Sequence, residues 1–129
     1  MKYLIDTQAL LWYAKGDARL GTTAKLIIES SNTRLLSIAT VWEIGIKVSL
    51  GKLTLDALPL DAFIEKQLRI NFYKILPIEL NHIFQLTNLP HHHKDPFDRI
   101  LIAQAISENI PIVSIDAAFV DNYGVQRIW

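Results

Sequence analysis

Short apolar runs alternate with segments of helical periodicity along this chain. The runs are rich in leucine, isoleucine and valine, whereas the segments between them repeat apolar residues every three or four positions. The expected strands are 3–5, 34–38, 74–78, 112–115 and 125–128. The expected helices are 9–14, 22–28, 40–49, 61–70, 79–86 and 95–107, with a short helix after Asp116. This alternation favours an α/β fold of three layers, with a mainly parallel central sheet flanked by helices.

Glycine and proline residues mark where several of these elements end. Gly51 lies where a helix-ending residue of left-handed conformation is expected. Pro77 has no backbone N–H to donate, so its strand is expected to end there or to lie at a sheet edge. Asp95 and Pro96 are residue types typical of an N-cap and a first helical position. Because no linker-like stretch separates the elements, we expect residues 1–129 to form a single domain.

The composition narrows the possible function classes. Half of the 129 residues are hydrophobic and a fifth are charged, as in an ordinary globular domain. The chain has no cysteine, which excludes disulfides, thiolate zinc sites and cysteine nucleophiles. Thirteen basic residues balance thirteen acidic ones, so the overall charge gives no reason to expect a non-specific nucleic-acid or membrane-surface binder. Any charged substrate must therefore be bound by local groups.

The start of the chain has no features of a secretory signal. Asp6 interrupts the first apolar run before a signal of that kind could form. No uncharged apolar run approaches the roughly 18 to 20 residues that a membrane span requires. We therefore expect a cytoplasmic protein that does not enter a membrane.

Four carboxylates interrupt stretches that otherwise look like core: Asp6, Glu43, Asp98 and Asp116. Each lies at the end of an expected strand or in the first turn of an expected helix. Taken singly, each has a structural explanation. Asp6 and Asp116 can cap the helices that follow them, Thr40 and Glu43 have the spacing of a capping box, and Asp98 can stabilise the first turn of its helix.

Taken together, the acids suggest a second explanation. In a parallel sheet they would project toward one rim, where several carboxylates repel one another unless something neutralises them. Hard divalent cations such as Mg²⁺ or Mn²⁺ prefer oxygen ligands and bridge carboxylates to phosphate groups. The spacing is therefore compatible with a metal-dependent phosphoryl-transfer site as well as with capping.

Other polar and aromatic residues are weaker candidates. The run His91–His93 is expected to form a solvated or phosphate-facing loop, because consecutive imidazoles diverge too much for one good metal site. Three tryptophans are expected in the core or in an interface: Trp12, Trp42 and Trp129. Four cations could guide a phosphate group along a rim or simply be solvated: Lys47, Lys52, Lys94 and Arg99.

Four stretches of the chain match a known pattern: MKYLIDTQALLW, SIATVWEIGIKVSLGKL, LPHHHKDPFDRILIAQA and IPIVSIDAAF. Together they resemble a PIN domain and, within that family, the VapC-type toxins of bacterial toxin–antitoxin pairs. These stretches span almost the whole chain in the expected order, and DPFDRILIAQA is the most specific of them. The resemblance implies a PIN-like fold and a ribonuclease that cleaves RNA with Mg²⁺ or Mn²⁺. It also implies a homodimer that a cognate antitoxin inhibits.

The resemblance also assigns roles to the acids. By resemblance, Asp6 and Asp98 are direct metal ligands, and Glu43 is a ligand or orients a metal-bound water. Asp116 acts around the metal or at a second metal, and Asp95 is an accompanying acid and helix cap.

One residue departs from the pattern. Gln8 stands where close relatives commonly have histidine, two residues after the first aspartate. Since Gln8 can still donate a hydrogen bond, we expect it to tune the site and not to abolish it.

Two other function classes stay open. An aspartyl-phosphate phosphatase or receiver domain would use a strand-end aspartate as nucleophile or phosphoacceptor, but Asp6-Thr7-Gln8 lacks the second aspartate of the phosphatase motif. An inactive PIN scaffold would bind only a partner, although all four acids are intact.

Overall fold

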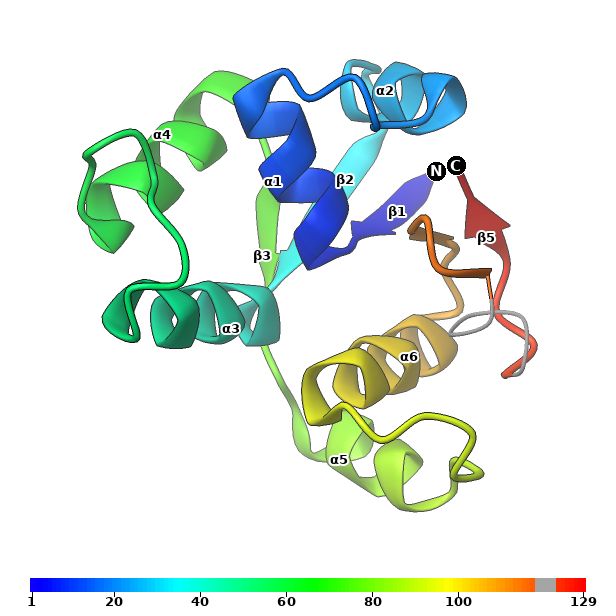
Figure 1. Ribbon diagram of the computed structural model, residues 1–129. Helices are drawn as coiled ribbons and strands as arrows, with labels where there is room; N and C mark the ends of the chain where they lie inside the picture. Colours follow the sequence, from blue (N-terminus) through cyan, green and yellow to red (C-terminus); the bar gives the residue numbers. More distant parts are fainter. Residues whose placement is uncertain (118–122) are drawn as a thin grey trace.

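The computed structural model describes residues 1–117 and 123–129 (Figure 1). Its strands are β1 (Lys2–Ile5), β2 (Thr33–Ser37), β3 (Lys74–Leu76), β4 (Ile112–Val113) and β5 (Arg127–Ile128). Its helices are α1 (Thr7–Lys15), α2 (Thr22–Ile28), α3 (Ile38–Ser49), α4 (Leu60–Asn71), α5 (Leu80–Thr87) and α6 (Pro96–Glu108). Within these ranges no helix is both long enough and apolar enough to cross a membrane.

The strands of the described residues form one sheet in the order β3-β2-β1-β4-β5, and every pairing is parallel. Leu4 of the central strand lies between Leu35 of β2 and Ile112 of β4. The predicted α/β fold with a mainly parallel sheet is therefore confirmed. Because the strands share one direction, the residues that follow β1, β2 and β4 emerge at the same edge of the sheet.

Helices cover both faces of this sheet. Successive strand residues point to opposite faces, so Leu4 packs with Ile102 of α6 in one hydrophobic cluster, whereas Ile5 packs with Leu10 of α1 in another. Figure 1 shows α1 and α2 on one side of the sheet and α5 and α6 on the other. The sheet is thus the buried middle layer of three, as predicted.

The start of α3 differs from the sequence expectation. The helix begins at Ile38 instead of Thr40, because Ser37 is the N-cap and its Oγ accepts the N–H of Ala39 at 3.0 Å. The preceding strand therefore ends at Ser37. Thr40 is fully buried within the helix, so the predicted capping box of Thr40 and Glu43 is wrong.

Other predicted boundaries are confirmed. β3 is an edge strand and ends at Leu76, immediately before Pro77. Gly51 follows α3 with a φ of 71°, which only glycine adopts without strain. Asp95 caps α6 ahead of Pro96. The helix expected after Asp116 falls mainly on residues 118–122, outside the described residues.

Candidate active site

A pocket of about 250 Å³ opens where β1 and β4 end. It is lined by Asp6, Thr7, Gln8, Glu43, Lys47, Asp95, Asp98, Ile115 and Asp116. The structure therefore brings together the four acids singled out in the sequence, which come from four separate segments of the chain. We call this the acid pocket. Several carboxylates face Lys47, the one cation among its described lining residues.

Asp6 lies at the base of the acid pocket, directly after β1. It is the N-cap of α1, and its Oδ1 accepts the N–H of Ala9 at 2.7 Å. Burial raises the pKa of Asp6 to about 6, although hydrogen bonds from Ser114 and Ala9 oppose the shift. The negative charges of Asp98 and Glu43 raise this pKa further, so the acids interact electrostatically.

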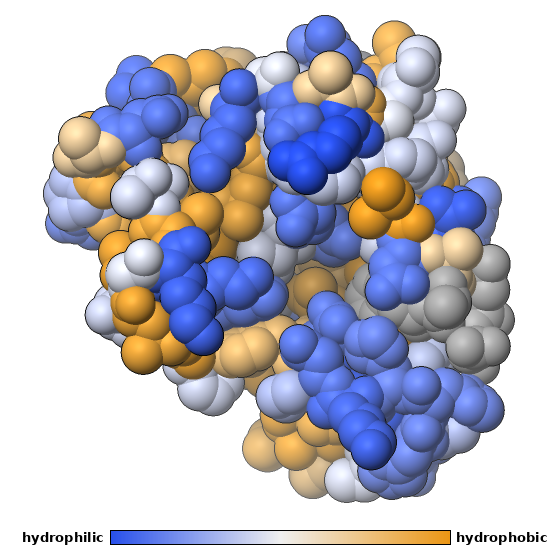
Figure 2. Space-filling model, in the orientation of Figure 1, coloured by the Kyte–Doolittle hydropathy of each residue, from blue (hydrophilic) through white to orange (hydrophobic). Residues whose placement is uncertain are grey.

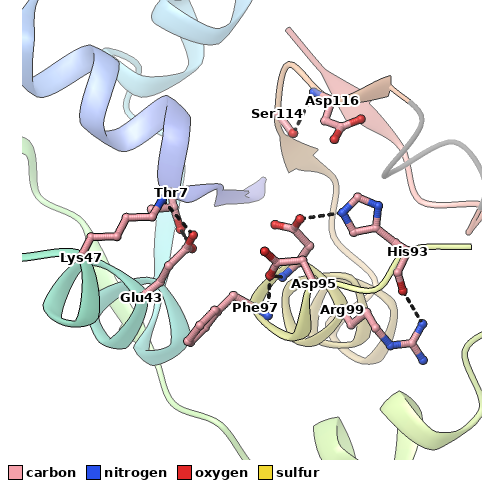
Figure 3. Close-up of polar contacts among 10 residues, drawn as sticks. Thr7, Glu43, Lys47, His93, Asp95, Phe97, Arg99, Ser114 and Asp116 are labelled. Carbon is pink, nitrogen blue, oxygen red and sulfur yellow. Dashed lines mark hydrogen bonds and ion pairs between the residues drawn. The ribbon is translucent and has the colours of Figure 1, made fainter. Parts of the chain in front are cut away.

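Glu43 enters the pocket from α3. Its Oε1 accepts the hydroxyl of Thr7 at 2.8 Å, and Oγ1 of Thr40 lies 3.1 Å from the same hydroxyl. Its Oε2 lies 3.3 Å from Nζ of Lys47, one helical turn along α3 (Figure 3). Buried Thr7 and the partly exposed Lys47 thus each hold one oxygen of the Glu43 carboxylate.

Asp98 is presented by the first turn of α6. Asp95 caps this helix, because its Oδ1 accepts the N–H groups of Phe97 at 2.9 Å and Asp98 at 3.1 Å. Burial raises the pKa of Asp98 above its usual value, and the charge of Asp95 acts in the same direction. A hydrogen bond of 2.7 Å between Oδ2 of Asp98 and Nε2 of His93 opposes this shift.

His93 is the site residue that the sequence analysis missed. The run His91–His93 was expected to form a solvated or phosphate-facing loop, yet the imidazole of His93 points toward Asp98, a lining residue of the acid pocket (Figure 3). The loop is held by Arg99, whose guanidinium donates to the carbonyl oxygens of Pro90 at 2.9 Å and His93 at 3.2 Å. Arg99 is buried, so both roles considered for it in the sequence, a phosphate-guiding cation and a solvated one, are wrong. The only sequence signal for His93 is its nearness to the α6 cap.

Asp116 lies on the loop after β4 and is exposed. Its backbone N–H donates to Oγ of Ser114 at 3.1 Å, which turns the chain at the end of the strand. Figure 3 shows Asp116 on the opposite side of the site from Glu43. The acids therefore surround the pocket instead of lying on one side of it.

The donor set of the acid pocket fits a hard divalent cation, because it consists of carboxylate oxygens. In the described ranges, however, no three His, Cys, Asp or Glu side chains are grouped closely enough to hold a metal ion. The acids instead engage protein groups: Asp6 with Ala9, Glu43 with Thr7 and Lys47, and Asp98 with His93. A cation would have to draw these side chains inward, which their mutual repulsion opposes when no cation is present.

Comparisons with known proteins agree with this architecture. VapBC2 from Rickettsia felis, bound to a promoter DNA fragment, superimposes with a TM-score of 0.76 at 16% identity, covering 100% of this chain and 99% of that one. FitAcB from Neisseria gonorrhoeae gives a TM-score of 0.70 at 15% identity, with coverages of 98% and 96%. VapBC-1 from nontypeable Haemophilus influenzae gives 0.68 at 16% identity, with coverages of 99% and 97%.

At these identities the superpositions show a shared fold. No curated protein sequence matches the chain. The sequence model of the PIN domain family matches residues 3–125, which is nearly the whole chain. This chain therefore belongs to the PIN domain family.

Proposed function

We propose that this PIN domain is a metal-dependent endoribonuclease that acts in the cytoplasm as the toxin of a toxin–antitoxin pair. The observation that carries the proposal is the acid pocket, where Asp6, Glu43, Asp98 and Asp116 converge from separate segments. Burial raises the pKa of Asp6, and the nearby charges of Asp98 and Glu43 raise it further. An arrangement of this kind is unfavourable for the protein alone and suits a cation-binding site.

Each residue has a distinct role in the proposed site. Asp6 and Asp98 hold Mg²⁺ or Mn²⁺, which when bound lowers the pKa of a water and stabilises charge on the phosphate. Glu43, oriented by Thr7 and Lys47, binds the metal or orients the attacking water. Asp116 acts around the metal or at a second metal.

The phosphoacceptor alternative fits the geometry less well. A nucleophilic Asp6 would need an oxygen open to the phosphorus atom, but this residue is only 8% exposed and one of its carboxylate oxygens accepts the Ala9 N–H. The inactive-scaffold alternative predicts an acid pocket that binds no metal, which the cleavage experiment below tests.

An apolar groove supports the proposed antitoxin partner. The groove lies between α3 and α4, with a volume of about 710 Å³ in one part and 360 Å³ in the adjoining part, and Val41 and Leu60 line both. Trp42 is 61% exposed at its edge, and Figure 2 shows hydrophobic surface over this side of the molecule. A toxin–antitoxin complex from Klebsiella pneumoniae contains a chain of similar fold, with a TM-score of 0.60 at 16% identity. We expect an amphipathic segment of the antitoxin to fill the groove.

The resemblance also implies a homodimer. Leu80 and Phe84 of α5 are 72% and 62% exposed, and they offer a second apolar surface apart from the groove. We propose that this surface lies in the dimer interface, leaving the groove accessible to the antitoxin.

A cleavage assay on a mixed RNA pool tests the nuclease. Wild type should cut in Mn²⁺ or Mg²⁺, and Asp98→Asn should be at least about a hundredfold slower, because the change removes a charge that holds the metal. Asp61→Asn is the matched control, since Asp61 also lies in the first turn of a helix but outside the acid pocket. Undiminished cleavage in EDTA would contradict the mechanism. If expression leaves growth unaffected while the purified protein cuts RNA, the toxin role is wrong and the nuclease stands.

A further inference from the structure

A second pocket, of about 310 Å³, adjoins the acid pocket and has no part in the chemistry proposed above. It is lined by Gln8, Leu11, Trp12, Lys15, Asp17, Arg19, Lys47, Lys52 and Leu53. Gln8 and Lys47 line both pockets, so the two are adjacent. We call the second one the basic pocket.

The ends of α1 and α3 place lysines around the basic pocket. Gln8, Trp12 and Lys15 have the spacing of a single face of α1, so this face runs from the acid pocket to Lys15. After α3 the chain turns at Gly51, and the N–H of Lys52 donates to the carbonyl oxygen of Lys47 at 2.9 Å. This turn folds Lys52 back beside the pocket.

The charges of the basic pocket are only partly neutralised. Arg19 pairs with Asp17 at 2.7 Å, and Lys47 lies 3.3 Å from Glu43. Lys15 and Lys52 are exposed, and no described residue forms an ion pair with either of them. In a chain of zero net charge, the pocket is a local positive region that directly adjoins a negative one.

A structural explanation accounts for part of this pattern. Lysines in the last turn of a helix interact favourably with the helix dipole, and Lys15 and Lys47 occupy such positions. Lys52 lies beyond the helix end, so the dipole does not account for its place. Nor does it account for the position of this pocket next to the acid pocket.

We infer that the basic pocket binds the phosphate backbone of single-stranded RNA beside the scissile phosphate, through Lys15 and Lys52. The inference rests on the proposed nuclease function. The acid pocket repels a polyanion in the absence of metal, so affinity for RNA has to come from neighbouring groups. The guanidinium carbon of Arg19 lies 4.7 Å from the ring centre of Trp12 and covers this ring, so recognition here is through phosphates and not base stacking.

Binding of a short labelled single-stranded RNA, measured by fluorescence anisotropy in EDTA over a salt series, tests the inference. EDTA prevents cleavage and leaves the acid pocket repulsive, which isolates the basic pocket. The double variant Lys15→Gln/Lys52→Gln should weaken binding and reduce the slope of log affinity against log salt by about 1.4, at roughly 0.7 per phosphate contact. The control Lys25→Gln/Lys66→Gln has the same net charge, and Lys25 also lies in the last turn of a helix.

The control should keep the wild-type slope. An equal change of the slope in both double variants would overturn the inference, because the loss of net charge or of helix stability would then account for it. No change in either variant would overturn it as well, because Lys15 and Lys52 would then make no contact with the RNA phosphates. Cleavage of the RNA pool in Mn²⁺ by wild type is measured alongside. Cleavage with an unchanged slope contradicts the basic pocket alone, whereas a reduced slope without cleavage supports an RNA site and contradicts the nuclease.

Discussion

Polar side chains are buried in two regions, the acid pocket and a network beneath α6 that is formed by Ser37, Gln104 and His82. The two regions differ in how these side chains are hydrogen-bonded and charged. In the network, Oγ of Ser37 lies 2.5 Å from Oε1 of Gln104, and Nε2 of Gln104 donates to the carbonyl oxygen of Pro77 at 3.2 Å. Nδ1 of His82 accepts the N–H of Glu79 at 3.0 Å. Ser37, Gln104 and His82 are fully buried, and the bonds that join them to one another and to the backbone bring no like charges together. Nε2 of His82 forms none of these bonds and lies 3.6 Å from a carboxylate oxygen of Glu108.

The acid pocket instead gathers like charges. Its carboxylates also have hydrogen bonds, yet burial and mutual repulsion raise the pKa of Asp6 and Asp98. A hydrogen-bonded neutral network stabilises the fold, whereas clustered carboxylates oppose it until a cation binds. The comparison indicates that the network serves stability and that the pocket serves function at some cost in stability.

The largest stability effect should come from the network. Gln104→Ala leaves the hydroxyl hydrogen of Ser37 without its acceptor and the Pro77 carbonyl without its donor, and it creates a cavity, so we expect a loss of about 3 kcal/mol in the free energy of unfolding. Urea denaturation measures this value. Gln126→Ala, at an exposed position, is the control and should stay within about 0.5 kcal/mol of wild type. Equal losses in both variants would show that the network is not special.

The next effect has the opposite sign. The folded pKa of Asp6 is raised from 3.8 to about 6, so protonation favours the folded state. The contribution of this protonation to the free energy of unfolding is complete below pH 3.8 and is lost as the pH rises through about 6. Asn keeps the N-cap without the charge, so Asp6→Asn in EDTA should be more stable than wild type at neutral pH by on the order of 2 kcal/mol.

Urea denaturation across this pH range measures the effect. The advantage of Asp6→Asn should vanish at acid pH, and Asp61→Asn, which changes an exposed acid, should show no comparable trend. An Asp6→Asn variant that is less stable than wild type at neutral pH would mean that the carboxylate acts chiefly as a helix cap.

The smallest effect concerns the contact between His93 and Asp98. Their side chains are 28% and 32% exposed, so water can replace the lost hydrogen bond, and His93→Ala should cost less than about 1 kcal/mol in EDTA. His91→Ala, in the exposed part of the same loop, is the control for effects on the loop itself. A loss as large as that of Gln104→Ala would remove the distinction between the two regions.

The fold could be predicted because its signal is local. Strand and helix patterns alternate, and parallel strands bring the residues after β1 and β4 to one edge, which is why Asp6 and Asp116 could be placed together from the sequence. The start of α3 was misplaced because Ser37 and Thr40 are both good capping residues. Their spacing does not reveal that Ser37 ends the buried strand.

The remaining features depend on contacts between distant segments. Ser37 and Gln104 are 67 positions apart, so their hydrogen bond has no sequence pattern. The positions of His93 and Arg99 depend on the path of a loop without regular structure, in which Arg99 reaches back to carbonyl groups. From the sequence, Arg99 could be predicted as a surface cation or as a buried hydrogen-bond donor. Which of the two it is depends on where the preceding loop places its carbonyl groups.

Thermal unfolding with and without Mg²⁺ tests most directly whether the acid pocket is a metal site. With about 10 mM Mg²⁺ and a dissociation constant of about 1 mM, wild type should gain about 1.4 kcal/mol, or about 5 °C, over its value in EDTA. Gln104→Ala should start lower and gain the same amount, because no residue of its network lines the acid pocket. Asp98→Asn should gain less than half of it. If Asp98→Asn gains as much as wild type, or wild type gains nothing, the acid pocket is not the metal site.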